Sequence, residues 1–425
     1  MCFAAAGSRC DAKQKAGCHI TGGSIVAVQI TEPDRLHALD AVRAFALLAG
    51  IVLHTTMSFF LPIPAMDVSQ SATLGVLFYV IHIFRMTLFF LIAGFFAHKV
   101  FHRRGFSAFA RDRVRRIALP MLVGWVILAP LMGVIVVWGL IRTFGDAGAE
   151  APEPPAMGLP LTHLWFLYYL CIFYVIVLAL RQLFVAVLGD SSWLHKFVDR
   201  LVAGLSSTVV GPVMFGLPLA LVFLTSPNWP AWFGLPTPDY GLTPQVPAMV
   251  GYGGAFVLGW FLDRQSDLLQ SIRRNGPAQL VLALVMTIVS LLLVGVIPSL
   301  EPNPFVSEAS WQRPVYILSY TSAMWFWTFG LIGTALRYLS QPSKRWRYLA
   351  DASYWMYLVH LPIVFVLQVA VAQLPLHWSL KFPAILLVTT ALLLISYHWL
   401  VRPTRLGKVL NGKIIPRRPP IEATA

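Results

Sequence analysis

The sequence contains few charged residues. Aspartate, glutamate, lysine and arginine make up 12% of its 425 residues, while apolar residues make up 57%. A typical soluble domain carries about 25% charged residues. The apolar residues gather in runs of about 20, the length that crosses a bilayer as a helix. This pattern excludes a soluble globular protein and predicts an all-α, polytopic integral membrane protein embedded in a lipid bilayer.

Cysteine is also scarce. Three of the four cysteines (Cys2, Cys10 and Cys18) precede the first apolar run, and Cys171 lies inside a later one. None of their spacings is typical of a metal site. We therefore expect no metal ion and no permanently bound cofactor.

Acidic residues are fewer than basic ones, 18 against 32, which gives a formal net charge of +14. In a soluble protein this excess could indicate binding to nucleic acid. In a membrane protein, lysine and arginine collect in the cytoplasmic loops. We therefore expect no nucleic-acid partner.

About ten apolar segments follow one another along the chain, and each is long enough to suggest a membrane span. They lie near 38–60, 74–98, 117–140, 163–188, 209–225, 246–263, 277–298, 313–337, 350–372 and 382–401. Residues 1–34 precede the first segment, and residues 402–425 follow the last. The sequence thus predicts one transmembrane domain over 35–401, flanked by two tails.

Lysine and arginine alternate between the predicted loops. The loop at 61–73 has none, for example, whereas the loop at 99–116 has seven. By the positive-inside rule both termini are cytoplasmic. The first tail lacks the apolar core of a signal peptide, so we expect a disordered cytoplasmic tail there. The expected location is the bacterial inner membrane.

Polar residues within the first two apolar segments mark a candidate site. Arg43 and His54 are eleven residues apart, so both lie on one helix face, roughly 16 Å from each other. His82 and Arg85 share a face of the second segment. Ionisable groups are costly in lipid, and they usually face protein or a water-filled cavity. Interfacial anchoring of Arg43, or a buried structural role for His54, remains an alternative.

Two further histidines lie in later spans. His163 opens the fourth, beside an aromatic belt, and either an interfacial or a cavity-lining role fits it. His360 lies two residues before Pro362. This proline removes the helical donor to the carbonyl of Leu358 and predicts a kink. A kink next to a histidine fits a cavity, although helix packing would also explain it.

The basic loop at 99–116 carries more charge than the positive-inside rule requires. Arg113 and Arg116 lie at its membrane edge. Such a cluster could bind anionic lipid or a soluble phosphate group.

Four motifs in order resemble the membrane-bound acyltransferase-3 family across about 35–400. They are the Arg-x10-His element at 43–54, FFLIAGFF at 89–96, the Arg-x-x-Arg at 113–116, and SYWMYLVH at 353–360. Ala93 stands where the family usually has serine. Within the family, HIFRMTLFF is most similar to the branch that adds succinyl groups to osmoregulated periplasmic glucans.

The resemblance implies a cytoplasmic acyl-CoA donor, succinyl-CoA or acetyl-CoA, and an extracytoplasmic carbohydrate acceptor. It implies donor binding by Arg43, Arg113 and Arg116, with His54 as general base. Arg85 or His82 would stabilise the oxyanion or hold a succinyl carboxylate. His163 and His360 would line the cavity or contact the acceptor. A covalent acyl-histidine is an alternative, and the carboxylate that would orient His54 is not evident.

Other functions also fit the sequence. The protein could acetylate another cell-surface polysaccharide or a lipid-linked sugar. It could instead be a permease or exporter of glucan or a small anion, in which the polar stripe lines a pathway. A non-catalytic role within the glucan-synthesis machinery is a third possibility.

Overall fold

The computed structural model describes residues 37–145, 159–189, 193–226, 229–299, 311–412 and 414. The described part is helical apart from loops and one isolated bridge between Pro160 and Tyr240. Eight of its helical segments are long and apolar enough to cross a membrane. The protein is therefore an all-α, polytopic membrane protein, as predicted. The N-terminal tail predicted at 1–34 lies outside the described residues.

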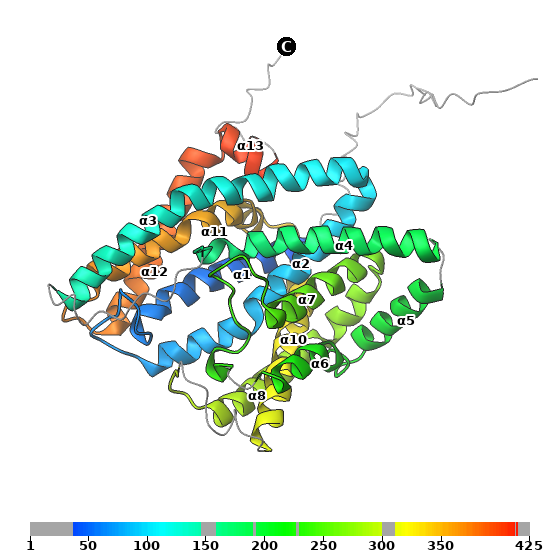
Figure 1. The fold of residues 1–425 in the computed structure, drawn as a ribbon, viewed down its shortest axis with the longest axis horizontal. Coiled ribbons are helices and arrows are strands. Elements are labelled where there is room, and N and C mark those ends of the chain that lie inside the picture. Colours follow the sequence, from blue (N-terminus) through cyan, green and yellow to red (C-terminus); the bar gives the residue numbers. More distant parts are fainter. Residues whose placement is uncertain are drawn as a thin grey trace, which may run out of the picture. The chain divides into compact units, whose positions relative to one another are not determined.

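A helix overlaps each of the ten predicted apolar segments, whereas α5 and α13 lie outside them. They are α1 (His37–Thr56), α2 (Ala72–Arg113), α3 (Leu119–Phe144), α4 (Trp165–Leu188), α5 (Trp193–Ser207), α6 (Val213–Leu224), α7 (Val246–Arg264), α8 (Leu268–Val294), α10 (Gln312–Tyr338), α11 (Lys344–Val371), α12 (Trp378–Ser396) and α13 (Arg405–Asn411) (Figure 1).

The predicted loop at 99–116 is wrong, because this stretch is mostly helical. Helix α2 continues to Arg113 and a π-helical turn, Val114–Ala118, joins it to α3. The helical conformation is broken at Gly105, whose φ of 73° and ψ of 174° lie outside the helical region. Glycine adopts positive φ at no steric cost. The helix therefore changes direction at Gly105 without forming a loop.

The predicted span at 209–225 is shorter than expected. Helix α6 has 12 residues, about 18 Å at 1.5 Å per residue, which is less than the hydrocarbon thickness. Pro212 directly precedes this helix, and the backbone N–H of Gly211 donates to the side chain of Thr208. A turn therefore occupies the first residues of the predicted segment.

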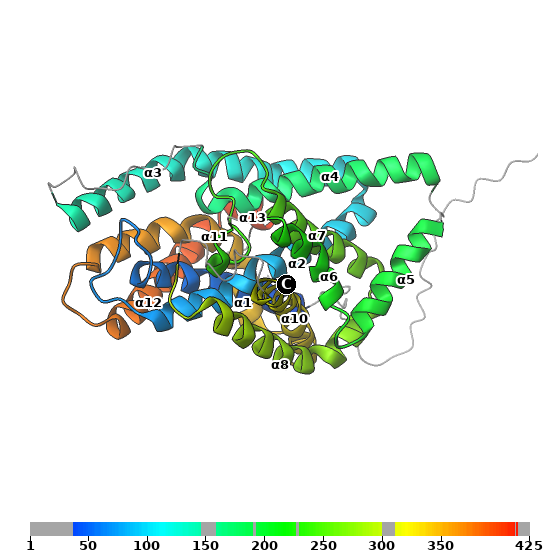
Figure 2. The ribbon, with the colours of Figure 1, turned by 60° about the horizontal axis from the view of Figure 1, so that its bottom comes forward.

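Helix α1 lies inside the bundle (Figure 1), where it packs against α2, α10, α11 and α12. Fourteen of its 20 residues are buried. Helices α3 and α4 run along one side of these inner helices in the view of Figure 2. A helix that is apolar nearly all round belongs in an interior, and this position surrounds the polar groups of α1 with protein.

Glycines bring α2 and α7 into close contact. A Cβ atom on Gly94 would lie within 1.9 Å of the Phe256 carbonyl oxygen, and one on Gly259 within 1.9 Å of the Leu91 carbonyl oxygen. Small residues let helix backbones approach each other in this way. The spacing of Gly251, Ala255 and Gly259 predicts such a seam. The structure confirms the close contact with α2 at Gly259, whereas Gly251 faces the side chains of Leu219 and Leu235.

A buried ion pair joins the loop after α1 to α12. The ammonium group of Lys381 lies 2.8 and 2.9 Å from the two carboxylate oxygens of Asp67, and it also donates to the carbonyl of Ala372. Both charged side chains are only 1% exposed. Because a buried charge is tolerated only when paired, Asp67 is committed to this pair.

Candidate active site

Arg43 and His54 both face α11, as their eleven-residue spacing predicts. Arg43 Nη2 donates to the Ala350 carbonyl at 2.6 Å. The ring centroid of His54 lies 5.1 Å from that of His360. As α1 advances from residue 43 to 54, its partners in α11 advance from 350 to 360. The two helices therefore run in the same direction, with Arg43 near their shared starting end.

Three histidines from three different helical elements meet beside the end of α1. His54 belongs to α1, His360 to α11, and His163 to the short 3-10 turn Thr162–Leu164 that leads into α4. The ring centroids of His163 and His360 are 5.2 Å apart. His163 and His360 are buried, and His54 is half-buried. We call His54, His163 and His360 the histidine cluster.

Pro362 explains how His163 is held. The proline has no N–H to donate to the carbonyl of Leu358, four residues earlier. In the structure His163 Nε2 lies 3.0 Å from this carbonyl oxygen. Because a carbonyl only accepts hydrogen bonds, the proton of His163 is on Nε2. The imidazole thus replaces the missing backbone donor and keeps one orientation.

His360 is held in the opposite tautomer. Its Nδ1 lies 2.7 Å from the Tyr357 carbonyl oxygen, so Nδ1 carries the proton and Nε2 of the neutral ring is left as an acceptor. The same tyrosine donates its hydroxyl to the carbonyl of His163 at 2.6 Å. The cluster therefore holds a ring nitrogen of His360 that can accept a proton.

Arg85 lies against α1 on the face that carries His54. A Cβ on Gly50, one helical turn before His54, would lie 2.8 Å from Arg85 Nη1. Arg85 is only 8% exposed. Its Nε and the Nδ1 of His54 are buried with no hydrogen-bond partner among the described residues. Buried polar atoms without partners are uncommon, which makes these two atoms candidates for contact with a substrate.

His82 lies at the edge of this site. It is half-buried and stacks on Phe78, with ring centroids 5.3 Å apart. It lies within electrostatic range of both His54 and Arg85. The structure therefore brings together the four histidines and the arginine that the sequence singles out within the spans.

Sequence reasoning missed two residues of this site. Gln368 donates from Nε2 to the carbonyls of His54 and Thr55, at 2.9 and 3.1 Å. Tyr357 contacts the rings of both His163 and His360. Tyr357 lies inside the motif SYWMYLVH, which the sequence analysis quotes. Gln368 lies two helical turns after His360, and an amide side chain in an apolar helix was the signal that could have identified it.

Arg113 and Arg116 lie at the junction of α2 and α3, away from the histidine cluster. Both contact the carboxylate of Asp112, at 3.0 Å each. The Tyr354 hydroxyl of α11 donates to the Arg116 carbonyl at 2.5 Å, and Arg116 contacts Gly412 after α13. Basic side chains thus gather at the end of the bundle where α1, α3 and α11 begin.

No carboxylate of the described residues is hydrogen-bonded to His54. Of the acidic candidates in the predicted outer loops, Asp67 is paired with Lys381. Asp239 contacts the start of the fourth span through its backbone. Glu301 and Glu308 lie outside the described residues. Arg85 is a charged group within electrostatic range of His54.

Fold and site together define a class of protein: a polytopic helical membrane protein with a buried centre of histidines and one arginine. The comparisons with known proteins give the family. A family model described as an acyltransferase domain matches residues 36–398. The chain belongs to this family, acyltransferase family 3, and is a membrane acyltransferase.

Curated relatives are more distant. The chain is 28% identical over 147 residues to glucans biosynthesis protein C of Escherichia coli strain K12, and 27% identical to the same protein of strains SMS-3-5 and O1:K1 / APEC. Each alignment covers 32% of this chain and 37% of the relative, so the match spans little more than a third of the relatives' length. No solved structure matches the chain significantly.

Proposed function

We propose that the protein transfers an acyl group from cytoplasmic acyl-CoA to hydroxyl groups of a periplasmic glucan, with succinyl as the favoured group. The observation that carries this proposal is the histidine cluster with Arg85 beside it. The cluster offers a proton acceptor, and the arginine offers a buried cation, which together suit acyl transfer. The name of the distant relatives supports a glucan as acceptor.

The reaction would use these groups as follows. His54 removes the proton from a sugar hydroxyl while that oxygen attacks the thioester carbonyl carbon. Arg85 stabilises the resulting oxyanion in a dry site, where such stabilisation is large. The carbon–sulfur bond then breaks, and the proton moves from the imidazolium to the CoA thiolate. His360 Nε2, facing the same cluster, can accept a proton from His54 or from the acceptor.

The two ends of α1 fit the two substrates. Arg43 lies where the basic side chains gather, which suits the phosphates of CoA. His54 lies about 16 Å further along the helix at 1.5 Å per residue. In this proposal Arg43, Arg113 and Arg116 bind the donor, whose arm follows α1 to the histidine cluster. His163 and His360 line the acceptor side, and His82 shares the role of Arg85.

A second candidate uses the same site with another acceptor. The family match carries no information on the sugar, so acetylation of another cell-surface polysaccharide or lipid-linked sugar fits the histidine cluster equally well. The family match argues against a permease, because the model that matches residues 36–398 describes an acyltransferase domain.

The deciding experiment measures CoA release by the purified protein in nanodiscs. Succinyl-CoA is compared with acetyl-CoA, with and without periplasmic glucan. We expect glucan-dependent release that falls about 10²- to 10⁴-fold in His54→Ala, the usual contribution of a general base. The faster donor identifies the acyl group.

The matched control is His377→Asn, which changes an exposed histidine at the start of α12 and should keep full activity. Release without glucan would indicate an acyl-enzyme or a different acceptor. Absence of release with both donors, from protein that elutes as folded, would contradict the proposal and favour transport.

A further inference from the structure

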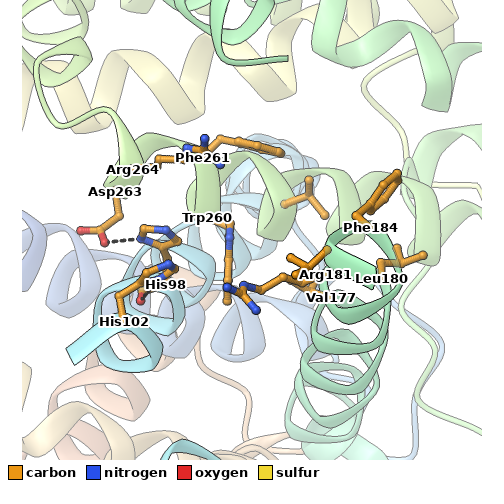
Figure 3. Close-up of a pocket in the computed structure, with 12 residues that line it drawn as sticks. His98, His102, Val177, Leu180, Arg181, Phe184, Trp260, Phe261, Asp263 and Arg264 are labelled. Carbon is orange, nitrogen blue, oxygen red and sulfur yellow. Dashed lines mark hydrogen bonds and ion pairs between the residues drawn. The ribbon is translucent and has the colours of Figure 1, made fainter. Parts of the chain in front are cut away.

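A cavity lies between α2, α4 and α7 (Figure 3), and none of the three histidines of the histidine cluster lines it. Its volume is about 560 Å³. It lies near the end of α7 and past the middle of α4. None of its lining residues takes part in the proposed acyl transfer.

Most of the wall of this cavity is apolar. Val177, Leu180 and Phe184 come from α4, and Val257 and Phe261 from α7. Leu180, Phe184 and Val257 are 45, 41 and 39% exposed, although they belong to membrane-spanning helices. In a bilayer these side chains face lipid, so the cavity opens sideways toward acyl chains.

The other part of the wall is cationic. Arg181 projects into the cavity (Figure 3), and its guanidinium lies 5.0 Å from the centroid of the Phe101 ring. A stacked guanidinium keeps its N–H groups in its own plane, where they can donate to a phosphate. Within the described part of the chain no carboxylate pairs with Arg181. Asp263, the acidic residue of the wall, is instead bound by His98 at 2.7 Å.

Helix α5 indicates the depth of the cavity in the bilayer. Its residues Trp193, Phe197 and Leu201 follow one another at four-residue intervals and are 73, 54 and 49% exposed. An exposed apolar stripe on a charged helix is typical of a helix in the membrane interface. Asp199 on α5 pairs at 3.0 Å with Arg264, at the rim of the cavity. The polar end of the cavity is therefore at the level of the lipid headgroups.

From these observations we propose that this cavity binds one anionic phospholipid. The headgroup phosphate contacts Arg181, and an acyl chain lies against Leu180, Phe184 and Val257. Basic pockets between membrane helices are suited to such headgroups. The lipid fills the gap between α4 and α7 and ties α4 to the bundle. This inference does not depend on the identity of the acyl donor or acceptor.

The test is native mass spectrometry of the detergent-purified protein titrated with phosphatidylglycerol or with phosphatidylcholine. We expect one phosphatidylglycerol to bind preferentially. Arg181→Gln should weaken its affinity about fivefold, the factor for about 1 kcal/mol from one arginine near anionic lipid. Val257→Trp fills the apolar part without changing charge and should weaken both lipids.

The matched control is Arg274→Gln, which removes an exposed charge near the start of α8. It should leave the preference unchanged. An equal loss of phosphatidylglycerol affinity in Arg181→Gln and Arg274→Gln would show that general surface charge causes the effect, and this would overturn the proposal. Displacement of the bound lipid by inorganic phosphate or CoA, in an Arg181-dependent way, would show a site for a soluble anion instead.

Discussion

The imidazole of His163 donates a hydrogen bond to the carbonyl of Leu358, in place of a missing backbone donor. The loss of this helical hydrogen bond is predictable from Pro362 alone. The donation by His163 to this carbonyl is not predictable, because His163 and Leu358 are 195 positions apart and no local pattern links them. The same contact fixes the tautomer of His163, so a packing feature and a chemical feature depend on one bond.

His163→Phe should therefore lower the stability of the protein as well as its acyltransferase activity. The Leu358 carbonyl would be buried without a donor, at a cost of about 1–3 kcal/mol. His163→Gln keeps an N–H donor and should recover part of this loss. Thermal unfolding in detergent measures the difference. Equal unfolding temperatures for the wild type and both variants would rule out the carbonyl contact as a stabilising bond.

Residue-level prediction succeeded where the signal was helical spacing. Arg43 and His54 share a face of α1, and His82 and Arg85 share one of α2, because 3.6 residues per turn decides this locally. The prediction missed Gln368, because its hydrogen bonds to the end of α1 depend on how far α11 runs alongside α1. The same long-range packing decides that Asp67 binds Lys381 and not a histidine.

The turn that leads into α4 is held in its conformation by hydrogen bonds to another segment of the chain. Thr162 has a φ of 50°, which is strained for a β-branched residue. The backbone N–H groups of Leu161 and Thr162 both donate to the Asp239 carbonyl, and the N–H of Gly241 donates to Leu159. The stretch at 239–241 thus fixes the turn that presents His163.

The side-chain carboxyl of Asp239 predicts a pH dependence. Burial raises the pKa of the Asp239 carboxyl to about 6, from about 3.9 in an unfolded chain. The folded state therefore holds the proton more tightly, so the contribution to stability is complete below about pH 4 and is lost as the pH rises through 6. Asp239→Asn should raise the unfolding temperature at pH 7.5 and leave it nearly unchanged at pH 4.

Asp267→Asn, at an exposed site before α8, is the control and should show neither effect. An Asp239→Asn variant that gains as much stability at pH 4 as at pH 7.5 would contradict the assigned titration.

The ends of helices were predicted well where an apolar run stops at proline or glycine. They were predicted poorly where a helix continues beyond its apolar run into charged residues. The stretch after residue 98 appears as a loop because charged residues interrupt the hydropathy. The backbone nevertheless stays helical to Arg113, since arginine and lysine are good helix formers. At this stretch hydropathy predicts where the chain leaves the membrane, whereas helix propensity predicts that the backbone stays helical.

For the whole molecule, the distribution of basic residues predicts an orientation. Arg43, Arg116 and the start of α11 lie at one end, and the Asp67–Lys381 pair joins elements at the predicted outer side. We expect a green fluorescent protein fused to the C-terminus to fluoresce, and alkaline phosphatase inserted in the loop at 61–71 to be active. A dark C-terminal fusion with inactive phosphatase in that loop would reverse the orientation.

The pairing of α1 with α11 has a consequence for how the protein is made. Arg43 receives its acceptor from Ala350, 307 residues later, and His54 meets His360 later still. At about 5–20 residues per second, α1 exists for about 15–60 s before these partners leave the ribosome. During that interval its arginine and histidine lack their final contacts in an environment that penalises polar groups. The first helix must therefore be sheltered, by other helices or by the insertion machinery, until nearly the whole chain has been synthesised.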